Sequence, residues 1–424
     1  MYSELLSVGQ ALDRILKYVV PLSTEKVPLS HALDRVLAEE LRTLHDLPPF
    51  DNSAMDGFAV RSEDTEGASE ESPATFVVIG DISAGEVPSE VIQPGQAMRI
   101  MTGAVLPQGA DAVVPVEETS VKDAMVGKEL PNQVLIEVQT GSGANVRRAG
   151  QDVTEGSLIL KAGHRLRPQD IGMLAASGIS HPLVHRKPRV ALLSTGDELV
   201  EVDKQLEPGQ IRDSNGYALE AAIRAAGGIP IRLGIASDTA EDVKEFLERG
   251  IQEGADLIVT SAGVSMGAYD FLRSVVQTHG KLDFWRVNIR PGKPLIMGVF
   301  RKIPLLGLPG NPVSALVTFE IFVKPVISKM SGMDEIERMW LKARLFHSIS
   351  SDTRESYLRA QITWKEGEYW ARLTGSQDSG VLSSLVKANA LIIIPAGVEY
   401  LPEGDQVEAW ILTHGSVTSG DEGQ

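Results

Sequence analysis

The sequence of 424 residues has no cysteine, few aromatic residues and a shortage of positive charge. The absence of cysteine excludes disulfide bonds, thiolate metal sites and cysteine nucleophiles. Against 57 Asp and Glu there are only 40 Lys and Arg, which gives a net charge of -17 and a pI near 5.0. Nucleic-acid phosphates require a basic surface, so we expect no nucleic-acid partner. A small anionic ligand stays compatible with this charge, because it needs only a local cationic pocket.

Long apolar runs are also missing. No stretch approaches the ~18 residues of a membrane-spanning helix. The first residues, MYSELL, lack the basic flank and apolar stretch of a signal peptide. We therefore expect a cytoplasmic protein without membrane segments. The chain is longer than the roughly 250–300 residues at which a single core stops growing, so we expect several domains.

The most informative segment is PFDNSAMDGFAV at 49–60. It places two carboxylates, an amide and a hydroxyl ahead of a short apolar strand, which is typical of a loop that displays groups to a ligand. A plain turn is the alternative. Before this segment, apolar spacing predicts one helix at 5–20 and a second that begins at Ser30. After it, short runs separated by Gly and Pro predict a compact β domain with strands at 58–61, 75–79, 98–100, 112–116 and 134–138.

The region 189–329 has a different pattern from the β domain before it, because strand-like and helical segments alternate there. This alternation predicts a three-layer α/β domain with a mostly parallel sheet. Its expected strands lie at 190–194, 229–235, 257–260 and 305–308, and its helices at 217–226, 240–253, 269–279 and 313–329. From residue 336 onward, further strand-like runs predict a second small β domain. The polar, Gly-rich end at 413–424 is expected to be disordered.

Ligands of an open parallel sheet bind outside the carboxyl ends of its strands. The first strand ends in STGDE at 194–198, where Gly196 lets the backbone approach a ligand and two acids follow. The second ends at Asp238, a plausible helix N-cap. The third runs into SAGVSMGAYD at 261–270, which has the composition of an anion nest but neither a P-loop nor a dinucleotide fingerprint. Helix capping is the ordinary alternative for each of these residues.

The fourth strand is followed by LPGNPVS at 308–314. Asn311 is a strong N-cap and Pro312 suits the first helical position, so a rigid helix start is expected at the same edge of the sheet. Cations are scarce on these loops, except for Arg290 and Lys293, which flank a tight turn. Both suit a phosphate, although a solvated turn is an equal alternative.

Several acids also fall at the ends of elements. If they converge, their mutual repulsion would raise some of their pKa values unless a cation intervenes. Oxygen ligands without Cys or paired His favour Mg²⁺ over Zn²⁺. The sequence leaves open whether these acids converge: Asp56, Asp152, Glu198, Asp238 and Asp270.

Six motifs occur in the order found in one known family. The sequence resembles the molybdopterin molybdenumtransferases, whose animal counterpart is the C-terminal domain of gephyrin, over nearly its whole length. The resemblance implies insertion of molybdate into adenylylated molybdopterin, with release of AMP and formation of molybdenum cofactor. The motifs that carry it are NSAMDG (52–57), MTGA (101–104), TGDEL (195–199), GVSMG (263–267), PGKP (291–294) and LPGNPVS (308–314).

The resemblance also implies a homodimer of elongated, four-domain subunits. A discontinuous N-terminal domain (1–45 and 149–184) would surround an inserted β domain (46–148). An α/β molybdopterin-binding domain (185–330) and a small C-terminal β-barrel domain (331–412) would follow. The partner's inserted domain would complete the cleft. Molybdopterin adenylyltransferase and recipient molybdoenzymes are further implied contacts.

Site residues carry over motif by motif. The resemblance implies catalytic roles for Asp56, Thr102, Asp152, Glu198, Asp238 and Asp270. Glu198 and Asp270 would hold Mg²⁺, which would polarise the pyrophosphate. Substrate contacts are implied for Ser265, Gly267, Arg290, Lys293, Pro309, Asn311, Pro312 and Ser314. Ala262 and Arg290 depart from the Gly and Lys common in the family, and Arg290 keeps the charge.

Two other functions compete with this interpretation. A molybdopterin adenylyltransferase resembles the α/β domain alone and has a Thr-Gly-Gly-Thr-Gly style loop, whereas this chain has SAGVS at 261–265 and additional domains with Asp56 and Thr102. A non-catalytic scaffold or carrier would not need the acids and the Arg/Lys turn. The sequence therefore favours the molybdenum transferase.

Overall fold

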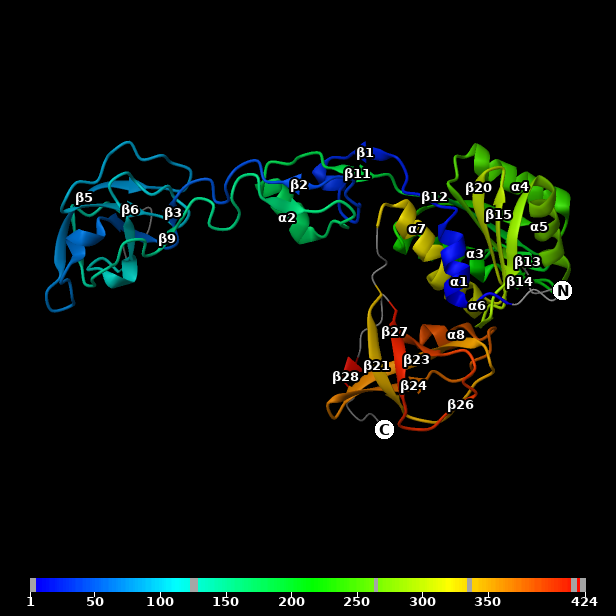
Figure 1. Cartoon of the computed structure of the whole chain (residues 1–424). Coiled ribbons are helices and arrows are strands. Elements are labelled where there is room, and N and C mark those ends of the chain that lie inside the picture. The colour runs from blue at the N-terminus through cyan, green and yellow to red at the C-terminus, as the bar shows by residue number, and fades with distance from the viewer. Residues whose placement is uncertain (1–4, 123–128, 263–265, 334–337, 413–417, 420–424) are drawn as a thin grey trace.

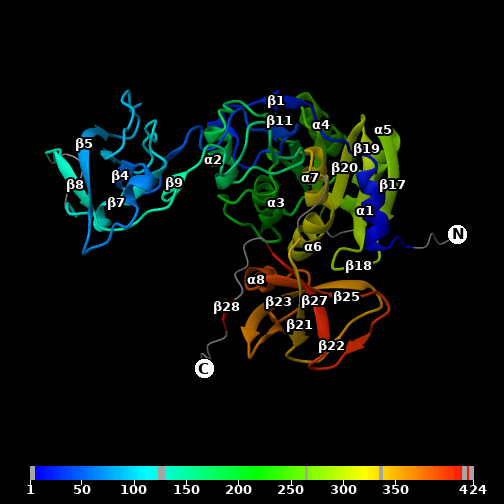
Figure 2. The same cartoon turned by 60° about the vertical axis from the view of Figure 1, so that its left-hand side comes forward.

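The computed structural model describes residues 5–122, 129–262, 266–333, 338–412 and 418–419. The chain forms an elongated arrangement of structural units (Figure 1). The inserted β domain lies at one end, a smaller mixed unit follows it, and the α/β domain lies at the other end with a β-barrel packed beside it. Figure 2 shows the same order of units from another side. None of the described helices is long and apolar enough to span a membrane.

The inserted domain is built on a sheet whose strands are ordered β7-β4-β6-β5-β8. All five predicted strands are confirmed: β4 (Gly57–Val60), β5 (Ala74–Ile82), β6 (Gln96–Ile100), β7 (Ala112–Pro115) and β8 (Gln133–Ile136). The smaller elements are β3 (Asn52–Ser53), β9 (Val146–Arg147) and the 3-10 helices η2 (Ser62–Thr65) and η3 (Val116–Glu118). Phe58 and Phe76 fill the core of the domain. A Cβ at Gly57 would lie 2.0 Å from the Val114 carbonyl oxygen, so only glycine fits directly after Asp56.

The mixed unit pairs segments from both sides of the insertion. Strand β1 (Thr24–Lys26) pairs with β11 (Leu183–His185), and β2 (Leu41–Arg42) with β10 (Leu158–Leu160). The predicted helix from Ser30 is wrong. Only a 3-10 turn, η1 (Leu29–His31), forms there, because Asp34 adopts a left-handed φ of 62°. The sequence also predicts a helix from Gln169 to Ser177, and this helix is confirmed as α2 (Pro168–Ala176).

The first helix, α1 (Val8–Leu16), packs on the α/β domain rather than on the mixed unit. Ser7 and Gln10 form a capping box at its start. Its buried residues Ala11 and Ile15 join the main core cluster of the α/β domain. Packing therefore separates α1 from the rest of the segment 1–45, as Figure 1 shows.

The α/β domain contains a six-stranded sheet ordered β15-β12-β16-β20-β19-β17. The first four strands are parallel and are the predicted ones: β15 (Ile229–Ala236), β12 (Arg189–Thr195), β16 (Leu257–Ala262) and β20 (Ile303–Leu308). Strand β19 (Pro294–Phe300) runs antiparallel between β20 and β17 (Gly280–Arg286). Strand β19 is not among the predicted strands, because its turn to β20 uses Arg301 and Lys302 at positive φ instead of the usual Gly or Asn.

Helices cover both faces of this sheet, which confirms the three-layer arrangement. One core cluster joins α1 and α3 (Ser214–Ala225) to the long run formed by α6 (Pro312–Thr318), the π-helix η4 (Phe319–Val323) and α7 (Lys324–Met330). The other cluster lies under α4 (Ala240–Gln252) and α5 (Met266–His279). The short parallel pair β13 (Leu199–Val200) and β14 (Ile211–Arg212) lies beside the sheet.

The C-terminal β domain is a closed barrel, as predicted. Its strands follow one another as β23-β24-β21-β27-β25, and β25 returns to β23. They are β21 (Trp340–Leu345), β23 (Glu355–Lys365), β24 (Glu368–Leu373), β25 (Ala390–Ile394) and β27 (Gln406–Ile411), with β22 (Ile349–Ser350), β26 (Tyr400–Leu401) and α8 (Leu382–Val386) beside them. Strand β18 (Ile289–Arg290) of the α/β domain pairs with β23. In the C-terminal tail, β28 (Thr418–Ser419) also pairs with β23.

Phe322 offers a test of the main core, because its side chain is fully buried in η4 between α1 and the sheet. We expect Phe322→Ala to destabilise the α/β domain by about 3–5 kcal/mol. Amide hydrogen exchange in β12 and β16 should then become about 100-fold faster or more. Val87→Ala serves as a control, since Val87 is 81% exposed in the inserted domain. An unchanged exchange rate in Phe322→Ala would contradict this account of the core.

Candidate functional site

The carboxyl edge of the sheet begins with the turn after β12. Gly196 follows this strand at a φ of 147°, a region that favours glycine. A Cβ at this position would lie 2.6 Å from a carboxylate oxygen of Glu198. The glycine therefore allows Glu198 to fold back over the end of the strand.

Three acids meet at this end of the sheet. The Asp238 backbone N–H donates to Asp197 Oδ1 at 3.1 Å. Burial, together with repulsion from Asp197 and Glu198, raises the pKa of Asp238. Its Oδ1 atom is buried and has no hydrogen-bond partner among the described residues. Such a cluster is satisfied by a proton or by a bound cation.

The structure brings Glu198 and Asp238 together, which the sequence left open, and adds Asp197. Two acids follow β12 in the sequence, but only Glu198 was among the predicted site residues. The cap of α4 is Thr239, whose side chain accepts from the Asp242 N–H. The interpretation of Asp238 as an N-cap is therefore wrong, and its carboxylate remains available to a ligand.

A buried network of hydrogen bonds connects the elements that form the carboxyl edge of the sheet. Asp213 is 2% exposed and accepts a hydrogen bond from Ser194 Oγ at 2.9 Å. It also caps α3 by accepting from the Gly216 N–H at 2.8 Å. The sequence DSNG at 213–216 predicts Ser214 or Asn215 as the cap of this helix, and this prediction is wrong. Asn215 instead donates from Nδ2 to the Gly310 carbonyl at 2.6 Å, which ties the start of α3 to the LPGNPVS turn.

The LPGNPVS turn places its helix start as predicted but uses Asn311 differently. Asn311 lies at the N-cap of α6 and Pro312 at its first turn, yet the Asn311 side chain makes no capping bond. It donates to Ser379 Oγ of the barrel at 2.7 Å. Pro309 and Ser314 are buried on either side. The turn therefore joins the α/β domain to the barrel as well as shaping the edge.

The cationic turn lies beside LPGNPVS. Gly292 has a φ of 106°, and a Cβ there would lie 2.4 Å from Thr318 Cγ2 and 3.8 Å from Pro309 Cγ. Arg290 Nη1 lies 3.6 Å from Asp352 Oδ2, while Lys293 is exposed. The structure thus brings Arg290 and Lys293 to the β20 side of the edge, and the acids to the β12 and β15 side. Strands β15 and β20 are three spacings apart, about 14 Å.

Three predicted site residues fall at or near the loop after β16. Ser265 lies outside the described residues. Gly267 and Asp270 lie in the first turns of α5, and nothing is described of the Asp270 side chain. Their roles stay predictions. In the described part of the chain, no group of three or more His, Asp or Glu is arranged to hold a metal ion.

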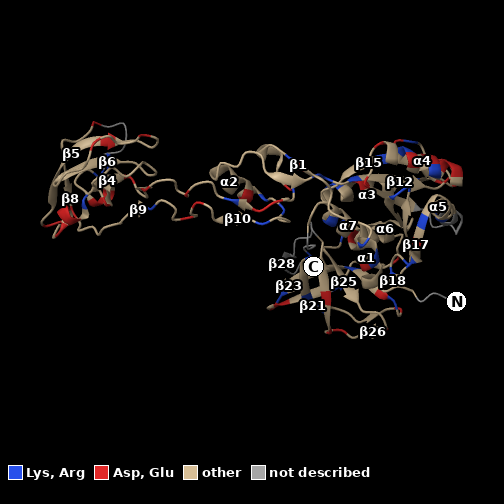
Figure 3. Ribbon diagram, turned by 45° about the horizontal axis from the view of Figure 1, so that its top comes forward, with Lys and Arg blue, Asp and Glu red and all other residues tan. Residues whose placement is uncertain are grey.

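The remaining predicted residues lie far from this edge. Asp56 Oδ1 accepts from the Thr102 N–H at 2.7 Å and from Thr102 Oγ1 at 2.8 Å, and these bonds lower the pKa of Asp56. Both residues belong to the inserted domain. Asp152 is exposed in the connection to the mixed unit, where its N–H donates to the Leu47 carbonyl at 2.9 Å. Figure 3 shows the inserted domain and the α/β domain at opposite ends of the molecule, each with acidic residues along its ribbon.

Fold and site together define a class: a multidomain α/β protein with a candidate ligand site at the carboxyl edge of a mostly parallel sheet. Three family models match successive segments of the chain. They describe the MoeA N-terminal region (domain I and II) at 6–178, a probable molybdopterin binding domain at 191–329 and the MoeA C-terminal region (domain IV) at 342–412.

Relatives match nearly the whole chain. The molybdopterin molybdenumtransferase of Nostoc sp. is 39% identical and spans 96% of this chain and 94% of its own. That of Haemophilus influenzae is 36% identical, over 92% of this chain and 94% of its own. The crystal structure of a molybdopterin biosynthesis MoeA protein from Pyrococcus horikoshii has a TM-score of 0.79 at 32% identity, covering 96% of this chain and 100% of that one. The chain belongs to the molybdopterin molybdenumtransferase family.

Asp238→Asn should stabilise the α/β domain at neutral pH by about 0.5–2 kcal/mol. The pKa of Asp238 is raised in the folded state, so above that pKa the ionised carboxylate lowers the free energy of unfolding. When Asp238 is protonated in both the folded and the unfolded state, this penalty is absent. The gain should therefore disappear as the pH falls below the ordinary value of 3.8. Urea denaturation across this pH range measures it. The exposed Asp203→Asn is the control, and a gain that does not depend on pH would refute the explanation.

Thr102→Val should raise the pKa of Asp56, because it removes the hydroxyl donor while leaving the backbone N–H in place. Thr102→Ser keeps a hydroxyl and should leave the titration close to that of the unmodified protein. The carboxyl carbon shift of Asp56, followed by NMR against pH, reports the change. Identical titration curves for the valine and serine variants would show that the hydroxyl has no such role.

Proposed function

We propose that the protein inserts molybdate into adenylylated molybdopterin, releases AMP and so forms molybdenum cofactor. Family membership supports this assignment. The observation that carries it is the carboxyl edge of the sheet, which has acids with an unsatisfied carboxylate oxygen on one side and a cationic turn on the other. An anionic nucleotide-linked pterin needs both: cations for its phosphates and acids to hold a metal ion beside them.

Arg290 and Lys293 would bind the phosphates of the substrate, beside the rigid turn formed by Pro309, Asn311, Pro312 and Ser314. Glu198 and Asp270, or Asp238 in place of one of them, would hold Mg²⁺. Magnesium keeps several waters and takes only one or two protein carboxylates besides substrate phosphates, so a complete protein cage is not required. The unpartnered Oδ1 of Asp238 fits such a ligand. When bound, Mg²⁺ supplies Lewis-acid polarisation of the pyrophosphate.

A homodimer would complete this site. Asp56 and Thr102 lie on the inserted domain, at the other end of the same subunit from Glu198 and Asp238 (Figure 1). Groups that act on one substrate must lie within a few ångströms of it, so the inserted domain of a second copy would supply them. Asp152, at the base of that domain, would approach the cleft from the same side.

The wider setting of the proposal follows from the chemistry. The protein would receive its substrate from a molybdopterin adenylyltransferase and deliver its product to recipient molybdoenzymes in the cytoplasm. The adenylyltransferase function itself fits less well, because the inserted and barrel domains would then have no role. A scaffold or carrier function would leave the paired acids and cations of the edge unexplained.

Release of AMP from adenylylated molybdopterin, with Mg²⁺ present, tests the function. Adding molybdate should start the release, and without molybdate little AMP should appear. Asp238→Asn and Asp270→Asn should each slow the release by about 100-fold or more. The exposed Asp203→Asn should not. Tight pterin binding without release, with molybdate or tungstate, would favour a carrier instead.

Mixed subunits test whether two copies share one site. Asp56→Asn and Glu198→Gln should each inactivate the homodimer when alone. If the two residues meet across subunits, half of the dimers in an equimolar mixture regain one intact site, which restores about a quarter of the full activity. If both residues act within one chain, the mixture stays inactive.

A further inference from the structure

A cavity of about 560 Å³ lies away from the carboxyl edge, where the mixed unit, the α/β domain and the barrel meet. Its walls are two helix faces. One is the C-terminal half of α3, with Ala221, Ala222, Ala225 and Ala226. The other runs along α6, η4 and α7, where Leu316, Glu320, Lys324, Ser328 and Ser331 repeat at intervals of three and four residues. This helical run gives the cavity a length of roughly 22 Å.

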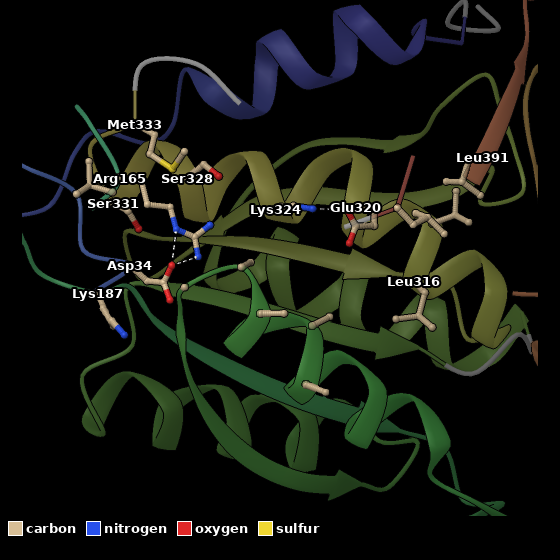
Figure 4. A pocket seen from close by; sticks show the side chains of 18 of the residues that line it. Asp34, Arg165, Lys187, Leu316, Glu320, Lys324, Ser328, Ser331, Met333 and Leu391 are labelled. Carbon is tan, nitrogen blue, oxygen red and sulfur yellow. Dashed lines mark hydrogen bonds and ion pairs between the residues drawn. The ribbon is translucent and has the colours of Figure 1, made fainter. Parts of the chain in front are cut away.

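The two ends of the cavity differ in chemistry. Figure 4 shows Asp34, Arg165 and Lys187 at one end, Glu320 and Lys324 along the middle, and Leu316 and Leu391 at the other end. The alanines of α3 leave room that larger side chains would fill. The charged end is contributed by the mixed unit, and the apolar end by α6 and the barrel.

The charged end has cationic groups that are incompletely satisfied. Arg35 is 8% exposed. Its Nη2 donates to Glu25 and to the His185 carbonyl, but its buried Nε has no partner among the described residues. Lys187 is half-buried and forms no ion pair with a described residue. Arg165 is paired with Asp34 at 2.9 Å.

The charge balance of the cavity opposes that of the whole chain. Four cationic side chains and two acids line it, although the protein carries a net charge of -17. Arg35 pairs with Glu25 through Nη2, so it is its buried Nε–H that lacks an acceptor, and Lys187 has no ion pair among the described residues; an anion at this end would satisfy both. The apolar end excludes a fully hydrated ion such as free phosphate. A ligand with an anionic head and an apolar body satisfies both ends.

We propose that this cavity binds a small amphipathic organic anion. Its carboxylate or phosphate head would lie near Arg35 and Lys187, and its aliphatic or aromatic body would pack on the alanines of α3 and on Leu316 and Leu391. The volume suits a drug-sized ligand. The cavity is separate from the proposed catalytic edge, because that edge lies at the N-terminal end of α3 and the cavity at its C-terminal half. The proposal therefore does not depend on the reaction.

A ligand held there would contact all three units at once. It should stabilise their relative arrangement, and with it the orientation of the mixed unit that leads to the inserted domain. Because it binds only the folded protein, it should also raise the temperature of unfolding, and the rise should continue with the logarithm of ligand concentration above saturation.

Anilinonaphthalene sulfonate, an amphipathic organic anion, is the probe. Its fluorescence should report one saturable site per folded chain. Octanoate or octyl phosphate should displace it, and whichever competes better identifies the preferred head group. Octanol and octylamine, which carry the same body without a negative charge, should compete at least about tenfold less well.

Two variants locate the site. Lys187→Glu reverses a charge at the polar end and should weaken probe binding about tenfold or more. Lys161→Glu makes the same change on an exposed lysine outside the cavity and should leave binding within about twofold. Ala222→Phe fills the space beside α3 and should abolish binding. Both cavity variants should keep the far-ultraviolet circular dichroism spectrum and the cooperative thermal unfolding of the unmodified protein, which reports that they fold.

Three results would overturn the proposal. Equal competition by octanol or octylamine would show that the negative charge is not recognised. Unchanged binding in Lys187→Glu and Ala222→Phe would place the probe elsewhere. If no organic anion binds, and the cavity variants instead convert a dimer to a monomer in light scattering, the cavity is part of an interface between copies of the chain.

Discussion

The buried carboxylate of Asp213 holds together the elements that form the ligand edge. It accepts hydrogen bonds from Ser194 at the end of β12 and from Gly216 in the first turn of α3. Arg232 of β15 lies 3.4 Å away and supplies the compensating charge that a buried carboxylate needs. The two strands that deliver the site acids and the helix that contacts the LPGNPVS turn are thereby fixed in one arrangement. The acids of the edge can then be crowded without distorting the sheet.

The elongated arrangement imposes the second constraint. Hydrogen bonds from Thr102 lower the pKa of Asp56, whereas burial and repulsion from Asp197 and Glu198 raise the pKa of Asp238. These complementary environments lie at opposite ends of one subunit (Figure 1). A mechanism that uses both Asp56 and Asp238 requires a second chain. The proposed reaction therefore depends on the proposed homodimer. A ligand in the cavity at the junction of the three units would affect this elongated arrangement, because the cavity lies where the extended part of the subunit begins.

Much of the fold could be predicted where local pattern and tertiary packing agree. Apolar runs bounded by Gly and Pro predict the four parallel strands and the strands of the inserted and C-terminal β domains. The closed barrel form of the C-terminal domain was implied only by the family resemblance. The prediction failed where a single backbone conformation decided the outcome. Apolar spacing after Ser30 resembles a helix, but the left-handed φ of Asp34 ends it. Strand β19 was missed because the hairpin turn at Arg301 and Lys302 carries no turn signature.

For the site, the sequence by itself determined which chemical groups are available: the motif acids, the cationic turn, and the glycines that only those turns can accommodate, such as Gly57 and Gly196. The residue types and their order in the chain are enough to determine which groups are available. Only the tertiary structure decided that Asp197 joins the acid cluster, that Asn311 contacts the barrel instead of capping its helix, and that the inserted domain lies far from the edge. These outcomes depend on contacts between residues distant in the sequence, which no local pattern encodes.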